Sequence, residues 1–259
     1  MAMTLPKRAG SVDHQMARDT FARAADAVAR VLSRTENWGP SGQRESQYAF
    51  DLTADEVCLN ELYDAGFAVF SEESGVTGDP SAPLVVVDPV DGSTNASRGL
   101  PWFATALCLL VDGQPEVALV ANHATGQRWE AVAGQGALCD GEPIAHSGCC
   151  TLSDAVVAMS GLPRHHYGWS QFRVLGASAP DLCLVASGVL DAWCDMHRGG
   201  HGLWDYAASA LICTEAGAVI GDVYDRDLFP LDPTERRSPI AAATPELFES
   251  FRAQRLQDD

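Results

Sequence analysis

The hydrophobic pattern at the start of the chain predicts two helices separated by a loop. From residue 11 to residue 32, apolar side chains recur at mostly helical spacing, with Arg and Asp between them. A second helix is predicted over residues 53–63, because Thr53 followed by Glu56 has the spacing of a capping box. The stretch 37–47 is rich in Gly, Pro, Ser and charge, which predicts a loop between the two helices.

Short apolar runs bounded by turn residues predict buried strands. They cover residues 67–70, 84–87, 104–111, 116–121, 127–133 and 156–159. Later the pattern alternates between predicted helices at 180–187, 204–216 and 245–254 and predicted strands at 192–196, 218–222 and 240–243. We therefore expect an α+β fold of layered sheets and helices in a single domain, with an N-terminal α+β half of about residues 1–150 and a C-terminal α/β half of about residues 151–259.

Composition and charge narrow the class of protein. The chain has 259 residues, of which 46% are apolar and 20% charged, so we expect a folded core. No apolar run approaches the roughly 20 residues of a membrane span, and no signal pattern opens the chain; we expect a soluble, cytoplasmic protein. The net charge of −18 repels nucleic acids and acidic membranes, so we expect neither as a partner. An acidic protein can still handle an anionic substrate through bound divalent cations, although the charge could equally serve solubility alone.

A cluster of acids after one predicted strand gives these cations a candidate site. Asp88 follows directly on the strand 84–87, and Asp91 comes three residues later. Both carboxylates can converge on one cation together with the Val90 carbonyl, and Gly92 would allow a phosphate to approach the backbone closely. On its own this pattern is equally compatible with a turn that carries solvated acids.

Two further segments favour the metal site. SEESG at 71–75, DPVDGSTN at 88–95 and WDYAA at 204–208 together resemble the signatures of the inositol monophosphatase family. The resemblance extends over nearly the whole chain, through DLTAD at 51–55, GQGA at 134–137, GASA at 176–179 and EAGA at 215–218. It implies a layered αβαβα sugar-phosphatase fold, with two sheets sandwiched between helix layers, and a lithium-sensitive, magnesium-dependent phosphatase. It also implies two or three Mg²⁺ ions, for which Mn²⁺ could substitute.

The resemblance also implies a role for individual residues. The implied metal ligands are Glu72, Asp88, the Val90 carbonyl, Asp91 and Asp205. The implied catalytic residues are Glu72 and Ser93, which would orient a metal-activated water for in-line attack, and Asp55, a carboxylate near the metals. The implied substrate contacts are Asp91, Gly92, Ser93, Thr94, Gly176, Ser178, Asp195 and Arg44. Serine at 93 replaces the usual threonine but keeps the hydroxyl, so we expect activity to survive.

The sequence departs from the family pattern near Asp195. The following segment, 196–203, is about three residues longer than usual, which bears on substrate identity. Two glycines between His197 and His201 argue against a helix, so we expect a solvated loop there rather than a metal-binding pair. Arg44 stands where many members carry lysine, which keeps the charge but changes the geometry.

The resemblance leaves the substrate open. Asn95 favours inositol monophosphate, with histidinol phosphate as the next candidate, followed by fructose 1,6-bisphosphate and other sugar phosphates. A hypothesis of a different class is an inactive scaffold relative, which would have lost a ligand; none of the implied ligands is missing. We also expect a homodimer that acts on a small phosphorylated metabolite.

Overall fold

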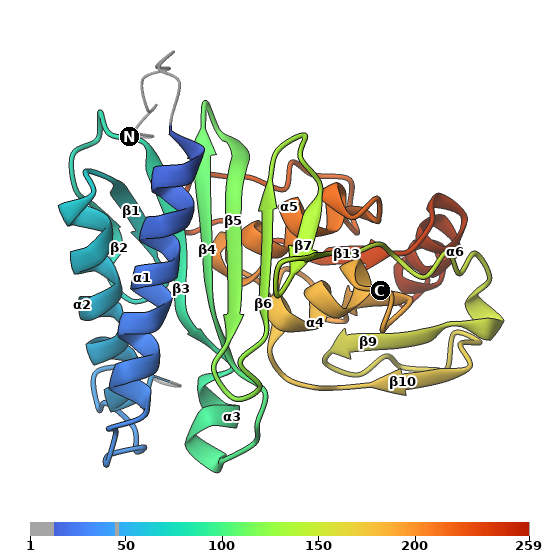
Figure 1. Ribbon diagram of the computed structural model, residues 1–259. Helices are drawn as coiled ribbons and strands as arrows, with labels where there is room; N and C mark the ends of the chain where they lie inside the picture. The colour runs from blue at the N-terminus through green and yellow to red at the C-terminus, as the bar shows by residue number, and fades with distance from the viewer. Residues whose placement is uncertain (1–12, 45–46, 259) are drawn as a thin grey trace.

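The protein, described here from a computed structural model for residues 13–44 and 47–258, is built in five layers (Figure 1). Helices α1 (His14–Leu32) and α2 (Ala49–Asp64) pack on one face of an eight-stranded sheet. Helices α4 (Ser178–Ala186) and α5 (Ala207–Glu215) lie between that sheet and a five-stranded sheet, and α6 (Pro245–Leu256) covers the far face of the second sheet. The expected αβαβα layering is therefore confirmed.

The first sheet has the strand order β2-β1-β3-β4-β5-β6-β7-β8. Its strands are β1 (Ala68–Ser71), β2 (Gly75–Thr77), β3 (Leu84–Asp91), β4 (Ala104–Val111), β5 (Gln114–Asn122), β6 (Arg128–Val132), β7 (Ala137–Cys139) and β8 (Glu142–Pro143). Only β1 and β3 pair in parallel, while every other pair is antiparallel. Because parallel strands end at the same edge of a sheet, the residues after β1 lie beside the end of β3.

The second sheet has the order β10-β9-β11-β13-β12. Its strands are β9 (Val156–Ser160), β10 (Gln171–Arg173), β11 (Ala192–Asp195), β12 (Val219–Asp222) and β13 (Pro239–Ala242). Three short helices complete the description: α3 (Ser93–Arg98) and the 3-10 turns η1 (Leu152–Asp154) and η2 (Leu203–Asp205). None of the helices within the described ranges is long and apolar enough to cross a membrane.

The core explains why the apolar runs of the sequence are so continuous. Every residue of β3 is buried, because helices cover both faces of the first sheet. Alternate residues such as Val85 and Leu107 belong to an apolar cluster with α1 and α2, whereas Phe70 and Val86 belong to a cluster with α4 and α5. A third cluster under α6 includes Phe251.

Two element boundaries differ from the sequence prediction in ways that concern the site. Helix α2 begins at Ala49 rather than at residue 53, because the Asp51 carboxylate accepts a hydrogen bond from the Tyr48 backbone N–H at 2.8 Å and caps the helix start. Strand β3 continues past Pro89 to Asp91, with a shift of register against β4 between Asp88 and Asp91. Such an irregularity accommodates a proline, which has no N–H to give to the ladder.

The predicted helix over 204–216 is also divided in two. Asp205 ends the 3-10 turn η2, and α5 starts only at Ala207. At the N-terminus, α1 starts at His14 with Asp13 as its cap, while residues 11 and 12 of the predicted helix lie outside the described residues. Residues 45 and 46 of the predicted loop 37–47 lie outside them too.

Candidate active site

The parallel pair β1 and β3 places two carboxylates side by side. Ser71 is paired with Val87, so Glu72 and Asp88 are the next residues on the two neighbouring strands. The Glu72 backbone N–H donates to the Val87 carbonyl at 3.1 Å, which extends the pairing by one step. The sheet itself therefore brings together two acids that are 16 residues apart in the sequence.

The irregular end of β3 fixes the next acid. Asp88 accepts a hydrogen bond from the Val90 N–H at 3.0 Å, which turns the backbone so that Asp91 follows inside the molecule. Asp91 in turn accepts from the Ala179 N–H of α4 at 2.5 Å. Both aspartates are buried, and the second one joins the first sheet to the middle helix layer.

The fourth carboxylate comes from the second half of the chain. Asp205 accepts from the Gly202 N–H at 2.7 Å within η2. The neighbouring Trp204 packs edge-on against Phe70 of β1, with ring centroids 5.5 Å apart, and thereby holds η2 against the first sheet. The segments that carry the four predicted acidic ligands thus meet at one edge of that sheet.

Burial and the charges of neighbouring acids both raise the pKa values in this cluster. Burial is the main cause that raises the pKa of Glu72 well above its usual value, and the nearby Asp205 charge is the next. Burial and the Glu72 charge do the same to the pKa of Asp88. Burial, followed by the Asp205 charge, raises the pKa of Asp91 to about 8. Four carboxylates that repel one another, two of them buried and two half-buried, need either protons or cations to neutralise them.

The donor atoms suit Mg²⁺ or Mn²⁺. In each of Asp88, Asp91 and Asp205, one carboxylate oxygen accepts a hydrogen bond from a backbone N–H, and the second oxygen can bind a cation. Carboxylate and carbonyl oxygens are the ligands that Mg²⁺ and Mn²⁺ prefer. Across residues 13–44 and 47–258, however, no three His, Cys, Asp or Glu side chains already stand as a preformed metal-binding group. The ligand set therefore stays a prediction, and the carboxylates would have to turn toward a cation.

Ser93 lies next to this cluster, and its carboxylate partner is Asp51. The Ser93 Oγ is 2.8 Å from Asp51 Oδ1 and 2.7 Å from the Val90 carbonyl oxygen. Asp55 is engaged elsewhere, accepting from the Ser71 hydroxyl at 2.5 Å. Burial is the main cause that raises the pKa of Asp51 to about 6. The predicted helix start at residue 53 left Asp51 outside the helix, so the sequence prediction gave it no role.

The turn that follows Asp91 faces the start of α4. Gly92 has φ 88°, and a Cβ there would stand 2.9 Å from the Ala177 Cβ, so only glycine fits. The Asn95 amide donates to the Trp102 and Leu175 carbonyls at 2.8 Å each.

The predicted substrate contacts of this region lie on these two facing segments. Gly176 lies against the Asn95 side chain, Ser178 follows it in the first turn of α4, and Thr94 accepts from the Tyr48 hydroxyl at 3.2 Å. The segment with Gly92 and Thr94 therefore faces the segment with Gly176 and Ser178.

Arg44 and Asp195 each have polar partners in the structure, and a substrate contact by Arg44 stays a prediction. Arg44 forms an ion pair with Glu73 and donates to the Glu72 carbonyl at 3.4 Å, so it neutralises an acid beside the cluster. Asp195 is completely buried and forms hydrogen bonds with its own loop, which leaves it no direct access to a substrate. The expectation of a solvated loop is wrong for His201, which is buried, while the His197 side chain is 61% exposed.

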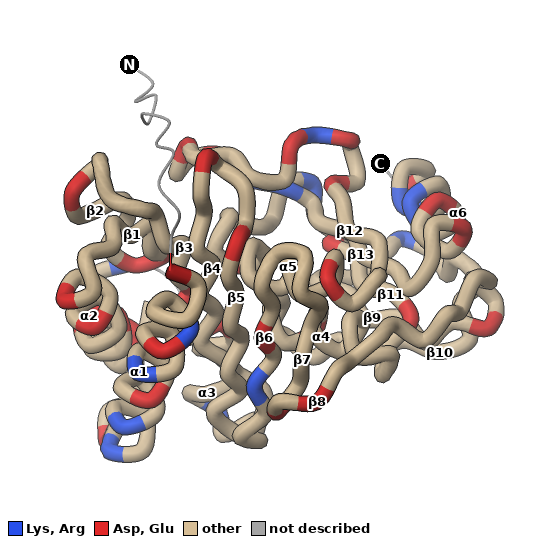
Figure 2. The backbone as a smooth tube through the Cα atoms, turned by 45° about the horizontal axis from the view of Figure 1, so that its top comes forward, with Lys and Arg blue, Asp and Glu red and all other residues tan. Residues whose placement is uncertain are grey.

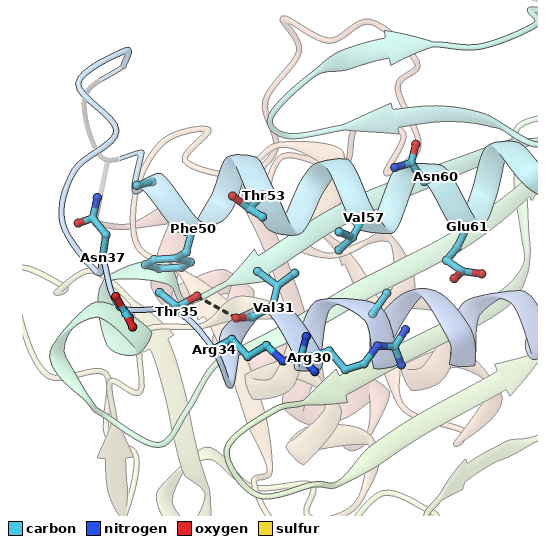
Figure 3. Close-up of a pocket in the computed structure, with 13 residues that line it drawn as sticks. Arg30, Val31, Arg34, Thr35, Asn37, Phe50, Thr53, Val57, Asn60 and Glu61 are labelled. Atoms are coloured by element: carbon cyan, nitrogen blue, oxygen red, sulfur yellow. Dashed lines mark hydrogen bonds between the residues drawn. The ribbon is translucent and has the colours of Figure 1, made fainter.

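A separate hollow of about 690 Å³ lies between α1 and α2 (Figure 3). Its lining includes Arg30, Arg34, Phe50 and Asn60, and none of its thirteen lining residues is one of the predicted site residues. Acidic residues, in turn, occur along much of the backbone (Figure 2). In the carboxylate cluster, by contrast, Asp88 and Asp91 are buried and Glu72 and Asp205 half-buried.

Comparison with known proteins identifies the family. The model of the inositol monophosphatase family matches residues 11–258. A fructose-1,6-bisphosphatase/inositol-1-monophosphatase of Methanocaldococcus jannaschii is 31% identical, with 82% of this chain and 85% of the relative aligned. An inositol-1-monophosphatase of Mesorhizobium japonicum is 30% identical over 78% of this chain and 82% of the relative.

Solved structures agree with the sequence relatives. A hypothetical protein of Pyrococcus horikoshii with similarities to inositol-1 monophosphatase superposes with a TM-score of 0.79 at 26% identity, covering 93% of this chain and 96% of that one. An inositol monophosphatase of Anabaena superposes with a TM-score of 0.76 at 25% identity, covering 95% and 97%. The chain therefore belongs to the inositol monophosphatase family and is a phosphoric monoester hydrolase.

Proposed function

We propose that this chain hydrolyses a small phosphate monoester in a Mg²⁺-dependent reaction, with inositol monophosphate as the leading substrate. The observation that carries the proposal is the cluster of the buried Asp88 and Asp91 with the half-buried Glu72 and Asp205, beside which Ser93 lies 2.8 Å from Asp51. Mutual repulsion among these acids would be relieved by cations, and an anionic phosphate would follow the cations into an otherwise acidic protein.

The residues divide into two groups by the work that we propose for them. Glu72, Asp88, the Val90 carbonyl, Asp91 and Asp205 would hold two or three Mg²⁺ ions, with Mn²⁺ as a possible substitute. Bound there, the cations would neutralise the phosphate oxygens, stabilise the leaving alkoxide and make water a stronger nucleophile. The backbone N–H groups of Gly92 and Ser93 would bind the phosphate.

The proton of the attacking water needs an acceptor, and we assign that role to Asp51 acting through Ser93. The Ser93 hydroxyl can donate to Asp51 while it accepts a hydrogen bond from the water, which orients the water for attack. Glu72 would fix the second hydrogen of the water. The sequence resemblance assigned no role to Asp51 and gave Asp55 as a carboxylate near the metals.

Fructose 1,6-bisphosphate is the second candidate substrate. It is favoured because several relatives are named as fructose-1,6-bisphosphatases. One of them, from Pyrococcus furiosus, is 31% identical over 82% of this chain. Histidinol phosphate remains a candidate on the sequence alone.

The test is phosphate release by the purified chain, with and without Mg²⁺, from inositol 1-phosphate, fructose 1,6-bisphosphate and histidinol phosphate. We expect release that requires Mg²⁺ and is fastest with inositol 1-phosphate. A preference for the bisphosphate would support the second candidate, and release that chelation of metal leaves unchanged would contradict the proposal. Millimolar Li⁺ should inhibit the reaction, as the family resemblance implies.

Two further expectations accompany the proposal. A homodimer is expected from the family resemblance, and apolar side chains such as Leu162, Phe172 and Val174, each at least half exposed, are candidates for its interface. A cytoplasmic location is expected from the sequence. Sedimentation of the purified chain tests the first expectation directly.

A further inference from the structure

Strand β4 has a single residue opposite the irregular part of β3. Between Asp88 and Asp91 the pairing of the two strands shifts its register. Pro89 and Val90 of β3 therefore stand together opposite one residue of β4, which is Thr105. Such a bulge leaves backbone groups without their partners in the ladder. Thr105 is completely buried and supplies one of these partners, because its hydroxyl donates to the Pro89 carbonyl at 2.7 Å.

This hydrogen bond holds one end of a peptide group whose other end holds an acid of the cluster. The Pro89 carbonyl and the Val90 N–H belong to the same planar peptide unit. The N–H donates to Asp88 Oδ1 at 3.0 Å, while the carbonyl accepts from Thr105. A rotation of the peptide plane would move the N–H away from the carboxylate. Thr105 therefore fixes the orientation of Asp88, including the oxygen that remains for a cation.

His123 holds the Thr105 hydroxyl in turn. It is the first residue after β5, which lies beside β4 in the first sheet (Figure 1), and its Nε2 is 2.7 Å from Thr105 Oγ1. The hydroxyl has one proton, and the Pro89 carbonyl can only accept, so His123 must donate from Nε2. Burial is the main cause that lowers the pKa of His123 from 6.5 to about 4. Near pH 7 the ring is therefore neutral and carries its N–H proton at this nitrogen.

This chain of hydrogen bonds ends at two of the proposed metal ligands. Hydrogen bonds in series polarise one another, so the His123 proton strengthens the Thr105 donor and, through the peptide, the N–H that holds Asp88. The next carbonyl along the chain, that of Val90, accepts from the Ser93 hydroxyl at 2.7 Å. Because the peptide before it is fixed as well, the Val90 oxygen has little freedom to turn away from the cluster.

We propose that Thr105 and His123 are positioning residues of the metal site, which hold the peptide between residues 89 and 90 so that Asp88 and the Val90 carbonyl present oxygen atoms to the same cation. The inference rests on the proposed function, in which both oxygens are metal ligands. It adds to the site one residue of β4 and one residue after β5, to which neither the sequence pattern nor the family resemblance gave a role.

The test measures Mn²⁺ binding to the full chain by titration calorimetry, without substrate, so that it does not depend on turnover. Thr105→Val keeps the shape of the side chain but removes the hydroxyl, and it should weaken the tightest Mn²⁺ site about tenfold. His123→Phe keeps a ring and leaves Thr105 bonded to Pro89, so the loss should be smaller, about threefold. Because His123 acts only through Thr105, the double variant should bind Mn²⁺ no more weakly than Thr105→Val alone.

Kinetics with the substrate that the wild type hydrolyses fastest should separate two constants. The Mg²⁺ concentration that gives half of the maximal rate should rise about tenfold in Thr105→Val. The KM for the substrate at saturating Mg²⁺ should stay near the wild-type value, because Thr105 acts on the metal ligands and not on the substrate. Thr105→Ser brings the hydroxyl back and should restore both the Mn²⁺ affinity and the Mg²⁺ requirement.

Thr20→Val is the matched control for the loss of a buried hydroxyl. Thr20 is also completely buried, and its hydroxyl donates to a backbone carbonyl, that of Met16, at 2.8 Å within α1. This variant should lose stability as Thr105→Val does, but its Mn²⁺ affinity should not change. Urea unfolding of the metal-free proteins measures the loss of stability in both variants.

The outcomes also separate this inference from the proposed function. Wild-type Mn²⁺ affinity in Thr105→Val, an equal loss of affinity in Thr20→Val, or losses that multiply in the double variant would each overturn the inference while the phosphatase assignment stands. If Thr105→Val does not fold, His123→Phe decides, and wild-type affinity in that variant overturns the inference. A wild-type chain that binds no Mn²⁺ and releases no phosphate would overturn the proposed function, and this inference with it.

Discussion

The Ser93 hydroxyl lies 2.8 Å from the Asp51 carboxylate, which joins the first turn of α2 to the turn that follows β3. This contact predicts which of two nearby aspartates serves the reaction. Asp51→Asn should lower kcat at least about a hundredfold, because it removes the proton acceptor while the amide preserves the shape and a hydrogen bond to Ser93. Steady-state kinetics with saturating Mg²⁺ measure the effect.

Asp55→Asn is the matched variant. It sits one turn further along the same helix and accepts from Ser71 rather than from Ser93, so its kcat should fall far less. If the two variants exchanged these effects, Asp55 would be the functional aspartate, as the sequence alone suggested.

Asp91→Asn should abolish turnover without unfolding the protein. The substitution removes a metal-binding charge but almost no volume, and the amide oxygen can still accept from the Ala179 N–H. In the metal-free protein it also removes one of several repelling charges, so the midpoint of urea unfolding should stay unchanged or rise. Asp64→Asn, at an exposed position at the end of α2, is the control for both measurements. Near-normal turnover by folded Asp91→Asn would refute the site.

Gly92→Ala should be far more harmful than Gly99→Ala. Both glycines have positive φ, 88° and 73° respectively, so each substitution carries a backbone cost of about 1 kcal/mol. At Gly92 the new Cβ would also meet the Ala177 Cβ at 2.9 Å and the Trp102 carbonyl at 3.0 Å, whereas no atom lies within 4 Å at Gly99. Thermal unfolding should therefore show a clearly larger loss for Gly92→Ala, accompanied by loss of phosphate release. Equal losses of thermal stability in the two variants would mean that the turn at Gly92 can shift to make room for a Cβ.

Asp181 predicts a pH-dependent difference in stability. Its carboxyl accepts from the indole N–H groups of Trp102 at 2.6 Å and Trp193 at 3.3 Å, and burial is the main cause that raises its pKa from 3.8 to about 7. The folded state thus favours the protonated form. The stabilisation that the protonated Asp181 carboxyl contributes is fully present below the pKa of this group in the unfolded chain. It is lost as the pH rises through about 7, the pKa in the folded protein.

Asp181→Asn removes this titration. The amide cannot accept from both indoles, so the variant should be less stable than wild type in acid. The difference in free energy of unfolding between wild type and Asp181→Asn should then narrow by up to about 4 kcal/mol between about pH 4 and about pH 8. Urea titrations at several pH values measure it, with Asp154→Asn, an exposed aspartate of η1, as control. A gap that is constant with pH would contradict the buried titration.

Much of the fold could be predicted from the sequence, because buried strands and amphipathic helices carry their own periodicity. The predicted strand 104–111 coincides with β4, and α6 begins at the predicted Pro245. Strand β10 was missed because its residues are exposed and short runs of that kind resemble loop. The two short strands β7 and β8 carry too few residues to leave a pattern.

The candidate site was harder to predict wherever a role depends on a contact between distant segments. The acids after β1 and β3 could be found from strand ends alone. Asp51 could not, since a helix start placed at residue 53 left it in a loop, and only the folded chain brings it to Ser93. Whether Asp195 is buried depends on how the following loop, with its two glycines, folds back onto the carboxylate. No local sequence pattern specifies that fold.

The middle helix layer has a consequence for how the chain is made. One face of the first sheet, with Phe70 and Val86, is covered by Leu182 and Leu211, which belong to α4 and α5 and are translated more than 90 residues later. During synthesis on the ribosome, this apolar face of the first half stays uncovered until α4 and α5 have been made. Its exposure to aggregation lasts until α5 has emerged, so the rate of synthesis between residues 130 and 215 bears directly on the yield of folded protein.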